Sequence, residues 1–145
     1  MKQKFTSNGW LVVNKPEGVE SFSVIRKLKF RYQFNKIGFV GTLDPLASGI
    51  LLIGINKATK LIPKMHLSKK SYEVQVRFGA ITPTLDSEGR YTSLESVSHD
   101  PQDRIHHIKK FIGTYQQKIP NFSAHKKEGK NFYELARNNE EIEDR

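Results

Sequence analysis

The chain has 145 residues, about the size of one ordinary domain. It contains no cysteine, which excludes disulfides and thiolate chemistry and predicts a cytoplasmic setting. The net charge is +9, and no apolar run approaches the roughly 20 residues of a membrane helix, so we expect no membrane partner.

The positive charge is concentrated in the first part of the chain. Residues 1–80 hold 14 Lys and Arg against 4 Asp and Glu, whereas residues 81–145 hold 10 against 11. A basic half beside a near-neutral half indicates a polyanionic partner on one face. Solvated lysines without a partner are the alternative. An anionic membrane is disfavoured because no strongly basic amphipathic helix stands out.

The first predicted elements are a strand and a helix. Residues 10–14 (WLVVN) predict a short buried strand, and residues 15–18 (KPEG) predict a turn. Ser21 is a suitable N-cap for the helix that follows. The apolar positions of this helix recur at helical spacing and are Phe22, Ile25 and Leu28. Its other face carries four basic residues, Arg26, Lys27, Lys29 and Arg31.

A glycine-bracketed loop, residues 38–49 (GFVGTLDPLASG), then places Asp44 just before the apolar run 50–55, which predicts a strand. Glycines permit unusual backbone conformations and a close approach to a ligand. Pro45 biases Asp44 toward an extended conformation, so this acid cannot lie inside a helix. Such a fixed carboxylate suits chemistry, but spacing alone favours the simpler alternative of an Asp-Pro turn that starts a strand.

The middle of the chain is predicted to contain a strand and a second helix. A short basic segment at 57–65 precedes residues 71–79, whose alternation predicts a half-buried strand with Tyr72 on its apolar side. A polar loop at 82–89 follows. Asp100 before Pro101 predicts a helix start, and Gly113 predicts its end. The apolar stripe of this helix would be Ile105, Ile108, Phe111 and Ile112.

The last segment, residues 115–137, predicts a strand, a basic loop at 123–130 and a short helix at 132–137. Strands and helices therefore follow one another irregularly along the whole chain. This order favours an α+β domain over a regularly alternating α/β sheet.

Few residues offer catalytic chemistry. The histidines are scattered and none is placed at metal-ligand spacing with a carboxylate, so no metal site is predicted. The chain has no phosphate-binding or dinucleotide glycine pattern, and no nucleophile elbow supports Ser/His/Asp hydrolysis. The remaining candidates are Asp44, Tyr72 and the basic residues around them.

Several blocks of residues together resemble the TruB-type tRNA pseudouridine(55) synthases. These blocks are residues 9–18 (GWLVVNKPEG), 36–38 (KIG), 41–49 (GTLDPLASG), 58–60 (ATK), 70–72 (KSY), the loop 82–89, 119–126 (IPNFSAHK) and 133–137 (YELAR). Any single block is weak evidence. The set is specific because the blocks follow the family's order and spacing over nearly the whole chain from residue 9.

The resemblance implies a pseudouridine synthase-like α+β fold, a mixed and mainly antiparallel sheet with flanking helices, incomplete at the C-terminus. Residues 1–8 would be a polar N-terminal extension, and residues 9–145 part of the catalytic domain. The implied activity is isomerisation of a uridine to pseudouridine in the T loop of tRNA, without a metal or organic cofactor. The protein is expected to be a cytoplasmic monomer.

The resemblance also implies roles for individual residues. Asp44 matches the family's catalytic aspartate, whose carboxylate is the nucleophile. Tyr72 matches the active-site tyrosine that packs against the target base, although without the resemblance a core aromatic is the simpler interpretation. Further substrate contacts are implied at Phe39, Gly41, Thr42, Leu43, Lys15, Lys60 and Lys126. For each of the lysines, a phosphate contact and an ordinary surface position are equally open.

Two departures from the family pattern leave alternatives open. Phe39 stands where the family commonly has a histidine, so the contact with the target loop would keep stacking and lose hydrogen bonding. The basic residue that pairs with the catalytic aspartate, typically an arginine, is expected beyond residue 145. The chain is therefore also compatible with a non-catalytic module that binds or folds tRNA, or with an inactive truncated fragment.

Overall fold

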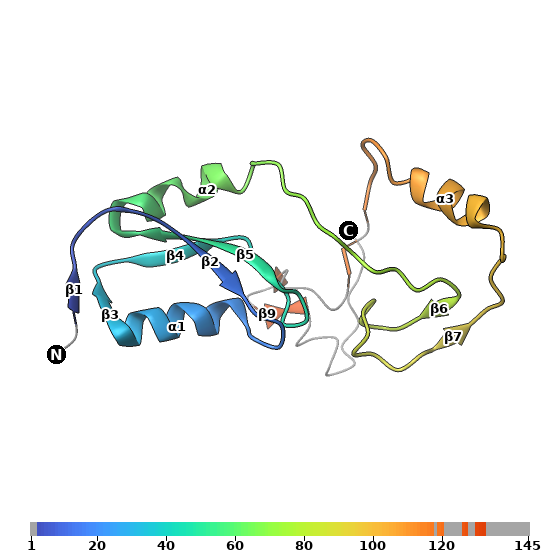
Figure 1. Ribbon diagram of the computed structural model, residues 1–145, viewed down its shortest axis with the longest axis horizontal. Coiled ribbons are helices and arrows are strands. Elements are labelled where there is room, and N and C mark those ends of the chain that lie inside the picture. The colour runs from blue at the N-terminus through green and yellow to red at the C-terminus, as the bar shows by residue number, and fades with distance from the viewer. Residues whose placement is uncertain (1–2, 118, 121–125, 128–129, 133–145) are drawn as a thin grey trace. The chain divides into compact units, whose positions relative to one another are not determined.

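A computed structural model describes residues 3–117, 119–120, 126–127 and 130–132 (Figure 1). The chain divides into two units, Met1–Tyr72 and Glu73–Arg145. Each unit mixes helices with short strands, and most of the described strand pairs are antiparallel. The α+β class expected from the sequence is thus confirmed.

A three-stranded antiparallel sheet forms the centre of the first unit. Its strands lie in the order β2 (Gly9–Lys15), β5 (Gly49–Ile55) and β4 (Ile37–Val40). β2 and β5 pair along their whole length. Both of the strands predicted in this region form, because each is an apolar run bounded by turn residues. The prediction that residues 10–14 are buried is wrong, because Val12 is 68% exposed and its neighbours are at most half-buried. The short strand β4 overlaps the start of the segment predicted as a loop at 38–49.

Helix α1 (Ser21–Arg31) covers one face of this sheet (Figure 1). The buried core between them consists of Val24, Ile25, Leu51 and Ile53. Ile25 and Leu28 contribute to the core as predicted, but Phe22 is 59% exposed. The prediction for Phe22 is wrong because the buried face of α1 runs through Val24 and Ile25, which leaves the Phe22 side chain largely in solvent.

The opposite face of the sheet carries the 3-10 helix η1 (Asn56–Leu61) and helix α2 (Ile62–Met65), and Figure 1 shows α2 on the side away from α1. Two paired glycines allow this close packing. A Cβ at Gly54 would lie 3.3 Å from backbone atoms of Ala58 and Thr59, and one at Gly38 would lie 2.9 Å from Cδ1 of Ile62. The predicted basic segment is therefore helical.

A second, two-stranded sheet completes the first unit. β1 (Gln3–Phe5) and β3 (Tyr32–Phe34) pair in parallel, with the Phe5 and Phe34 ring centroids 5.4 Å apart. β1 lies within the segment that was expected to be a polar extension. The N-terminal residues from Gln3 onward thus take part in the fold of this unit.

The second unit contains an antiparallel pair, β6 (Ala80–Ile81) and β7 (Ser93–Leu94), which encloses the polar loop predicted at 82–89. Helix α3 (Pro101–Lys109) follows, and the side chain of Asp100 accepts a hydrogen bond from the Gln102 N–H at 2.8 Å. The predicted start of this helix is confirmed. Its predicted end at Gly113 is wrong, because α3 ends at Lys109 and leaves Phe111 and Ile112 outside the helix. All four predicted stripe residues are exposed, so they form no buried face.

The half-buried strand predicted at residues 71–79 is not formed. Residues 71–77 belong to no helix or strand, and Tyr72, Val74 and Val76 are between 62% and 72% exposed. Alternation gives a strand only where a neighbouring strand pairs with it, and no strand among the described residues pairs with this segment.

The end of the chain is described only in part. β8 (Lys126–Lys127) and β9 (Lys130–Asn131) pair antiparallel in the region predicted as a basic loop. Residues 115–117 and 119–120 form no strand, contrary to the prediction. The helix predicted at 132–137 lies outside the described residues beyond Phe132.

Candidate active site

The loop that holds Asp44 connects β4 to β5 at one end of the sheet. Gly41 has φ +70° and Gly49 has φ +133°, values that favour glycine. The side chain of Asp44 is exposed, and the Ala47 N–H donates to the Asp44 carbonyl at 3.0 Å. Within the part of the chain that the structure describes, the Asp44 carboxylate has no hydrogen-bond or ion-pair partner. The carboxylate is thus presented to solvent from a fixed turn.

A buried lysine holds the loop on the C-terminal side of Asp44. The side chain of Lys15 is fully buried, and its Nζ donates to three backbone carbonyls, those of Val19 at 2.6 Å, Pro16 at 3.0 Å and Pro45 at 3.3 Å. The Gly18 N–H also donates to the Pro45 carbonyl, at 2.8 Å. A buried ammonium is stable only when hydrogen bonds compensate its lost hydration. Lys15 is therefore not an ordinary surface lysine, and it ties the turn at 15–18 to the residue after Asp44.

A buried serine holds the loop on the N-terminal side of Asp44. The Ser21 Oγ donates to the Leu43 carbonyl at 2.9 Å and accepts from the Leu43 N–H at 3.0 Å. Helix α1 instead has Glu20 as its N-cap residue, without a side-chain cap. The prediction that Ser21 caps the helix is wrong, because its hydroxyl bonds to the distant loop.

The other loop residues with predicted substrate contacts differ in exposure. Thr42, two residues before Asp44, is exposed, whereas Gly41 and Leu43 are half-buried. Phe39 is half-buried in β4, where it packs against the core of the first unit. Much of the Phe39 side chain is thus used in the fold, and its contact with a substrate stays a prediction.

Tyr72 and Lys126 are the last two predicted site residues along the chain, well beyond the Asp44 loop. Tyr72 is 69% exposed, so the alternative of a core aromatic is wrong. Lys126 belongs to β8 in the second unit, and its side chain is outside what the structure describes. Gly41, Thr42 and Leu43 belong to the Asp44 loop itself, and Lys15 is the predicted site residue from another segment that bonds to this loop among the described residues.

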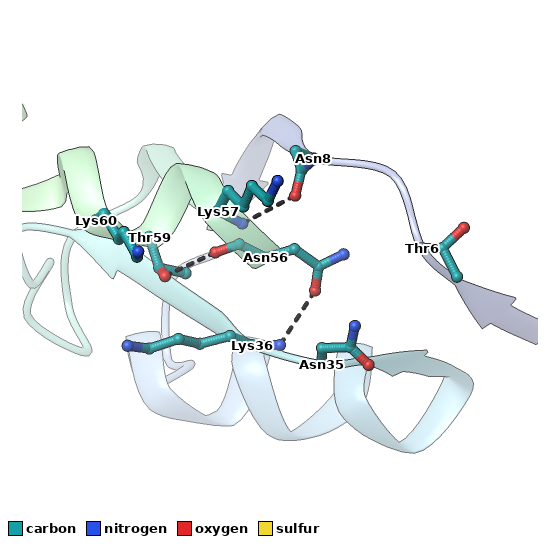
Figure 2. A pocket seen from close by; sticks show the side chains of 8 residues that line it. All are labelled: Thr6, Asn8, Asn35, Lys36, Asn56, Lys57, Thr59 and Lys60. Atoms are coloured by element: carbon teal, nitrogen blue, oxygen red, sulfur yellow. Dashed lines mark hydrogen bonds between the residues drawn. The ribbon is translucent and has the colours of Figure 1, made fainter.

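Lys60 lies near the other end of the sheet, in a pocket of about 440 Å³ that Lys36 and Lys57 also line (Figure 2). The length of β5 places this pocket roughly 20 Å from the Asp44 loop. All three lysines are exposed. Arg26–Glu20 is the one ion pair among the described residues, so the pocket carries uncompensated positive charge.

Asn56 builds the wall of this pocket. It adopts φ +53°, a left-handed conformation that asparagine tolerates better than most residues. Its Nδ2 donates to the Ser7 carbonyl at 2.7 Å, and its Oδ1 accepts from the Lys36 N–H at 3.1 Å. Figure 2 shows the latter bond and the neighbouring bond from the Lys57 N–H to Asn8 Oδ1, at 3.0 Å. Sequence reasoning identified Lys60 and missed the rest, because these contacts join residues far apart in the chain.

The described residues include no group of three or more His, Asp or Glu side chains that could hold a metal ion. None of their helices is long and apolar enough to cross a membrane.

The charge is uneven between the units, since Met1–Tyr72 holds 13 Lys and Arg against 3 Asp and Glu. The first unit thus combines one exposed carboxylate loop with a strongly cationic surface.

Comparison with known proteins gives a family for this arrangement. The model of the TruB family pseudouridylate synthase (N terminal domain) matches residues 27–145. Three proteins named tRNA pseudouridine synthase B are similar to the chain. That of Clostridium kluyveri is 44% identical over 136 residues, covering 94% of this chain and 47% of the relative. That of Fusobacterium nucleatum is 42% identical over 135 residues (93% and 47%), and that of Ureaplasma urealyticum is 43% identical over 132 residues (89% and 57%).

These relatives agree in how much of their own length is matched. The chain spans about half the length of the relatives named above. The matched family model covers most of this chain, including the Asp44 loop. The chain therefore belongs to the TruB family of pseudouridylate synthases, as the sequence blocks predicted.

Proposed function

We propose that this chain carries the nucleophile of a tRNA pseudouridine synthase that isomerises one uridine in the T loop. The observation that carries the proposal is the Asp44 loop, in which an exposed carboxylate lies between two residues held by buried side chains. The relatives are named tRNA pseudouridine synthase B, which indicates the class of RNA.

The reaction requires a nucleophile that reaches a nucleotide outside its stack. Conversion of uridine to pseudouridine breaks the bond between C1′ and N1 and forms one between C1′ and C5, while a proton leaves C5 and N1 gains one. Transient attachment of an enzyme carboxylate to the nucleotide frees the base to turn. A target base inside a helix must be extruded before it can be attacked. We assign the nucleophile to Asp44, whose exposed loop can meet such a nucleotide.

Tyr72 is proposed to stack on the extruded base. Its ring is 69% exposed and therefore available to a ligand. Stacking of a base on an aromatic side chain contributes about 1–3 kcal/mol. We propose that Tyr72 acts in recognition of the base, whereas Asp44 supplies the chemistry.

We propose that the cationic surface of the first unit binds the phosphates of the tRNA T arm. Helix α1 exposes four basic residues, Arg26, Lys27, Lys29 and Arg31, and the pocket at η1 adds Lys36, Lys57 and Lys60. Phosphate contacts from such residues position an RNA without reading its sequence. The protein is proposed to act on tRNA in the cytoplasm as a monomer.

The decisive experiment measures tritium release from C5-labelled uridine in a T-arm RNA hairpin. It uses this chain and a fusion of this chain to the C-terminal half of the Clostridium kluyveri relative. Asp44→Asn is expected to abolish release and to leave the RNA dissociation constant within about two-fold, because the amide keeps the size of the side chain and loses the nucleophile. Glu95→Gln, at an exposed carboxylate in the second unit, is the matched control and should retain full release. Release that survives Asp44→Asn would contradict the proposal.

A non-catalytic module that binds or folds tRNA is the second candidate. It is favoured by the absence of a cationic partner for the Asp44 carboxylate among the described residues. RNA binding without Asp44-dependent release in both proteins would select this candidate. A chain that shows no cooperative thermal unfolding would instead indicate an inactive fragment.

A further inference from the structure

We infer that Ser21 is a positioning residue that sets the direction of the Asp44 carboxylate through the backbone of Leu43. This inference rests on the proposed function, because it concerns the same loop. Both side-chain hydrogen bonds of Ser21 end on Leu43, and neither reaches the Asp44 side chain. Its effect on catalysis would therefore be indirect.

The two hydrogen bonds of Ser21 fix both peptide groups of Leu43. The Leu43 N–H belongs to the peptide that follows Thr42, and its carbonyl belongs to the peptide that leads into Asp44. Because a peptide group is planar, holding the Leu43 carbonyl also orients the N–H and the Cα of Asp44. Distances of 2.9 and 3.0 Å are ordinary for a hydroxyl that donates once and accepts once.

Burial makes this contact durable. Ser21 is 2% exposed, so water has little access to compete for its hydroxyl. On the other side of Asp44, the Pro45 carbonyl receives the Lys15 ammonium and the Gly18 N–H. The backbone is thus held on both sides of the carboxylate while Asp44 itself stays exposed.

At the start of helix α1, Ser21 bonds to the loop and does not cap its own helix. A serine at the start of a helix usually caps its first turn. Here the N-cap position is Glu20, which provides no side-chain cap, and Ser21 is the first helical residue. Its hydroxyl bonds to a residue 22 positions away in the sequence. The loop, and not the helix, thus receives the hydroxyl of Ser21.

The test compares Ser21→Ala, Ser21→Thr and Ser23→Ala in the tritium-release assay. Ser23 is the matched control because it lies in the same helix and its hydroxyl accepts from Arg26, not from the loop. A misplacement of about 1 Å can lower a rate on the order of 100-fold. We expect Ser21→Ala to lower kcat by about 10- to 100-fold with KM within about two-fold, and Ser21→Thr to recover most of kcat. Ser23→Ala should change neither constant.

Hydrogen exchange of the Leu43 amide gives a second readout that does not require activity. In Ser21→Ala this amide should exchange at least about ten-fold faster, while amides of β5 keep their protection. Unchanged exchange and unchanged kcat in Ser21→Ala would overturn the inference. If Ser21→Ala also loses β5 protection, the folded Ser21→Thr variant decides: recovered kcat supports the inference, and lost kcat overturns it. If no protein releases tritium, the proposed function fails, and Leu43 exchange alone still decides whether Ser21 holds the loop.

Discussion

At the scale of single residues, the candidate site depends on polar side chains that bond to backbone groups. Lys15, Ser21 and Asn56 are all buried, and each joins segments that are far apart in the sequence, by 30, 22 and 49 residues respectively. Such side chains have few acceptable replacements, because removing one leaves its partners without a hydrogen bond. The loop around Asp44 should therefore be sensitive to substitutions that never touch a substrate.

Lys15→Met tests this sensitivity. Methionine keeps the apolar stem of the side chain but leaves the carbonyls of Val19 and Pro45 without the ammonium donor. Hydrogen bonds to charged groups contribute about 1.5–3 kcal/mol, so the free energy of unfolding should fall by on the order of 3 kcal/mol. Urea unfolding at equilibrium measures this change.

Lys27→Met is the matched control for that experiment. Lys27 is exposed on helix α1, so its replacement should alter the free energy of unfolding by no more than about 0.5 kcal/mol. Equal urea midpoints for Lys15→Met and Lys27→Met would show that the buried ammonium does not stabilise the loop.

The same residues show why part of the site was not predictable from the sequence. A serine before a helical pattern has the signature of a cap, and only the fold reveals that Leu43 lies close enough to take its hydroxyl. The sequence block around Lys15 indicated a family position without indicating burial. Asp44 itself was found by resemblance to a family, since its spacing alone favoured an ordinary turn.

At the scale of elements, predictions succeeded where the signal is local. β2 and β5 are apolar runs between turns, and Asp100 with Pro101 marks the start of α3 directly. The alternating segment at 71–79 failed because alternation describes one strand and says nothing about its partner. The apolar residues predicted to line α3 are exposed for a related reason. Helical periodicity identifies an apolar face of a helix, but it does not show whether another element packs on that face.

The packing of η1 on the sheet gives a prediction at this scale. A Cβ at Gly54 would lie 3.2 Å from the Trp10 ring and 3.3 Å from backbone atoms of Ala58 and Thr59. Gly54→Ala should therefore push η1 away from β5 and lower the free energy of unfolding by about 1–3 kcal/mol. Thermal or urea unfolding measures the loss.

Gly9→Ala provides the control on the neighbouring strand. No atom lies within 4 Å of a Cβ built at Gly9, so this alanine meets open space. It should leave the protein unchanged or stabilise it by up to about 1 kcal/mol, because alanine restricts the unfolded chain. If both variants were equally stable, close packing of η1 would not be the reason for glycine at position 54.

At the scale of the whole molecule, charge separates the two units. Residues 1–72 carry a surplus of +10, whereas residues 73–145 hold 11 Lys and Arg against 12 Asp and Glu. The basic half predicted from the sequence therefore coincides with the unit that contains the Asp44 loop. If RNA binds this unit, the logarithm of its affinity should fall linearly with the logarithm of salt concentration.

Charge reversal at matched positions tests whether RNA binds a specific cationic surface or responds only to the net charge of the protein. Lys57→Glu with Lys60→Glu alters the pocket at η1, and Lys109→Glu with Lys110→Glu makes the same change of net charge at α3. Each lost phosphate contact lowers the salt slope by roughly 0.7–0.9. The pocket variant should therefore lose about 1.5 units of slope, and its affinity for T-arm RNA at low salt should fall at least about ten-fold.

The α3 variant is expected to retain most of the slope, because its lysines belong to the near-neutral unit. Fluorescence anisotropy of a labelled T-arm hairpin, titrated between low and physiological salt, measures both quantities. Equal losses in the two variants would mean that RNA responds to net charge alone, and the pocket would then have no special part in binding. If only the pocket variant lost salt slope and affinity, the RNA would contact the end of the sheet opposite Asp44, roughly 20 Å away. Recognition of the RNA backbone and attack on the uridine would then occupy opposite ends of β5.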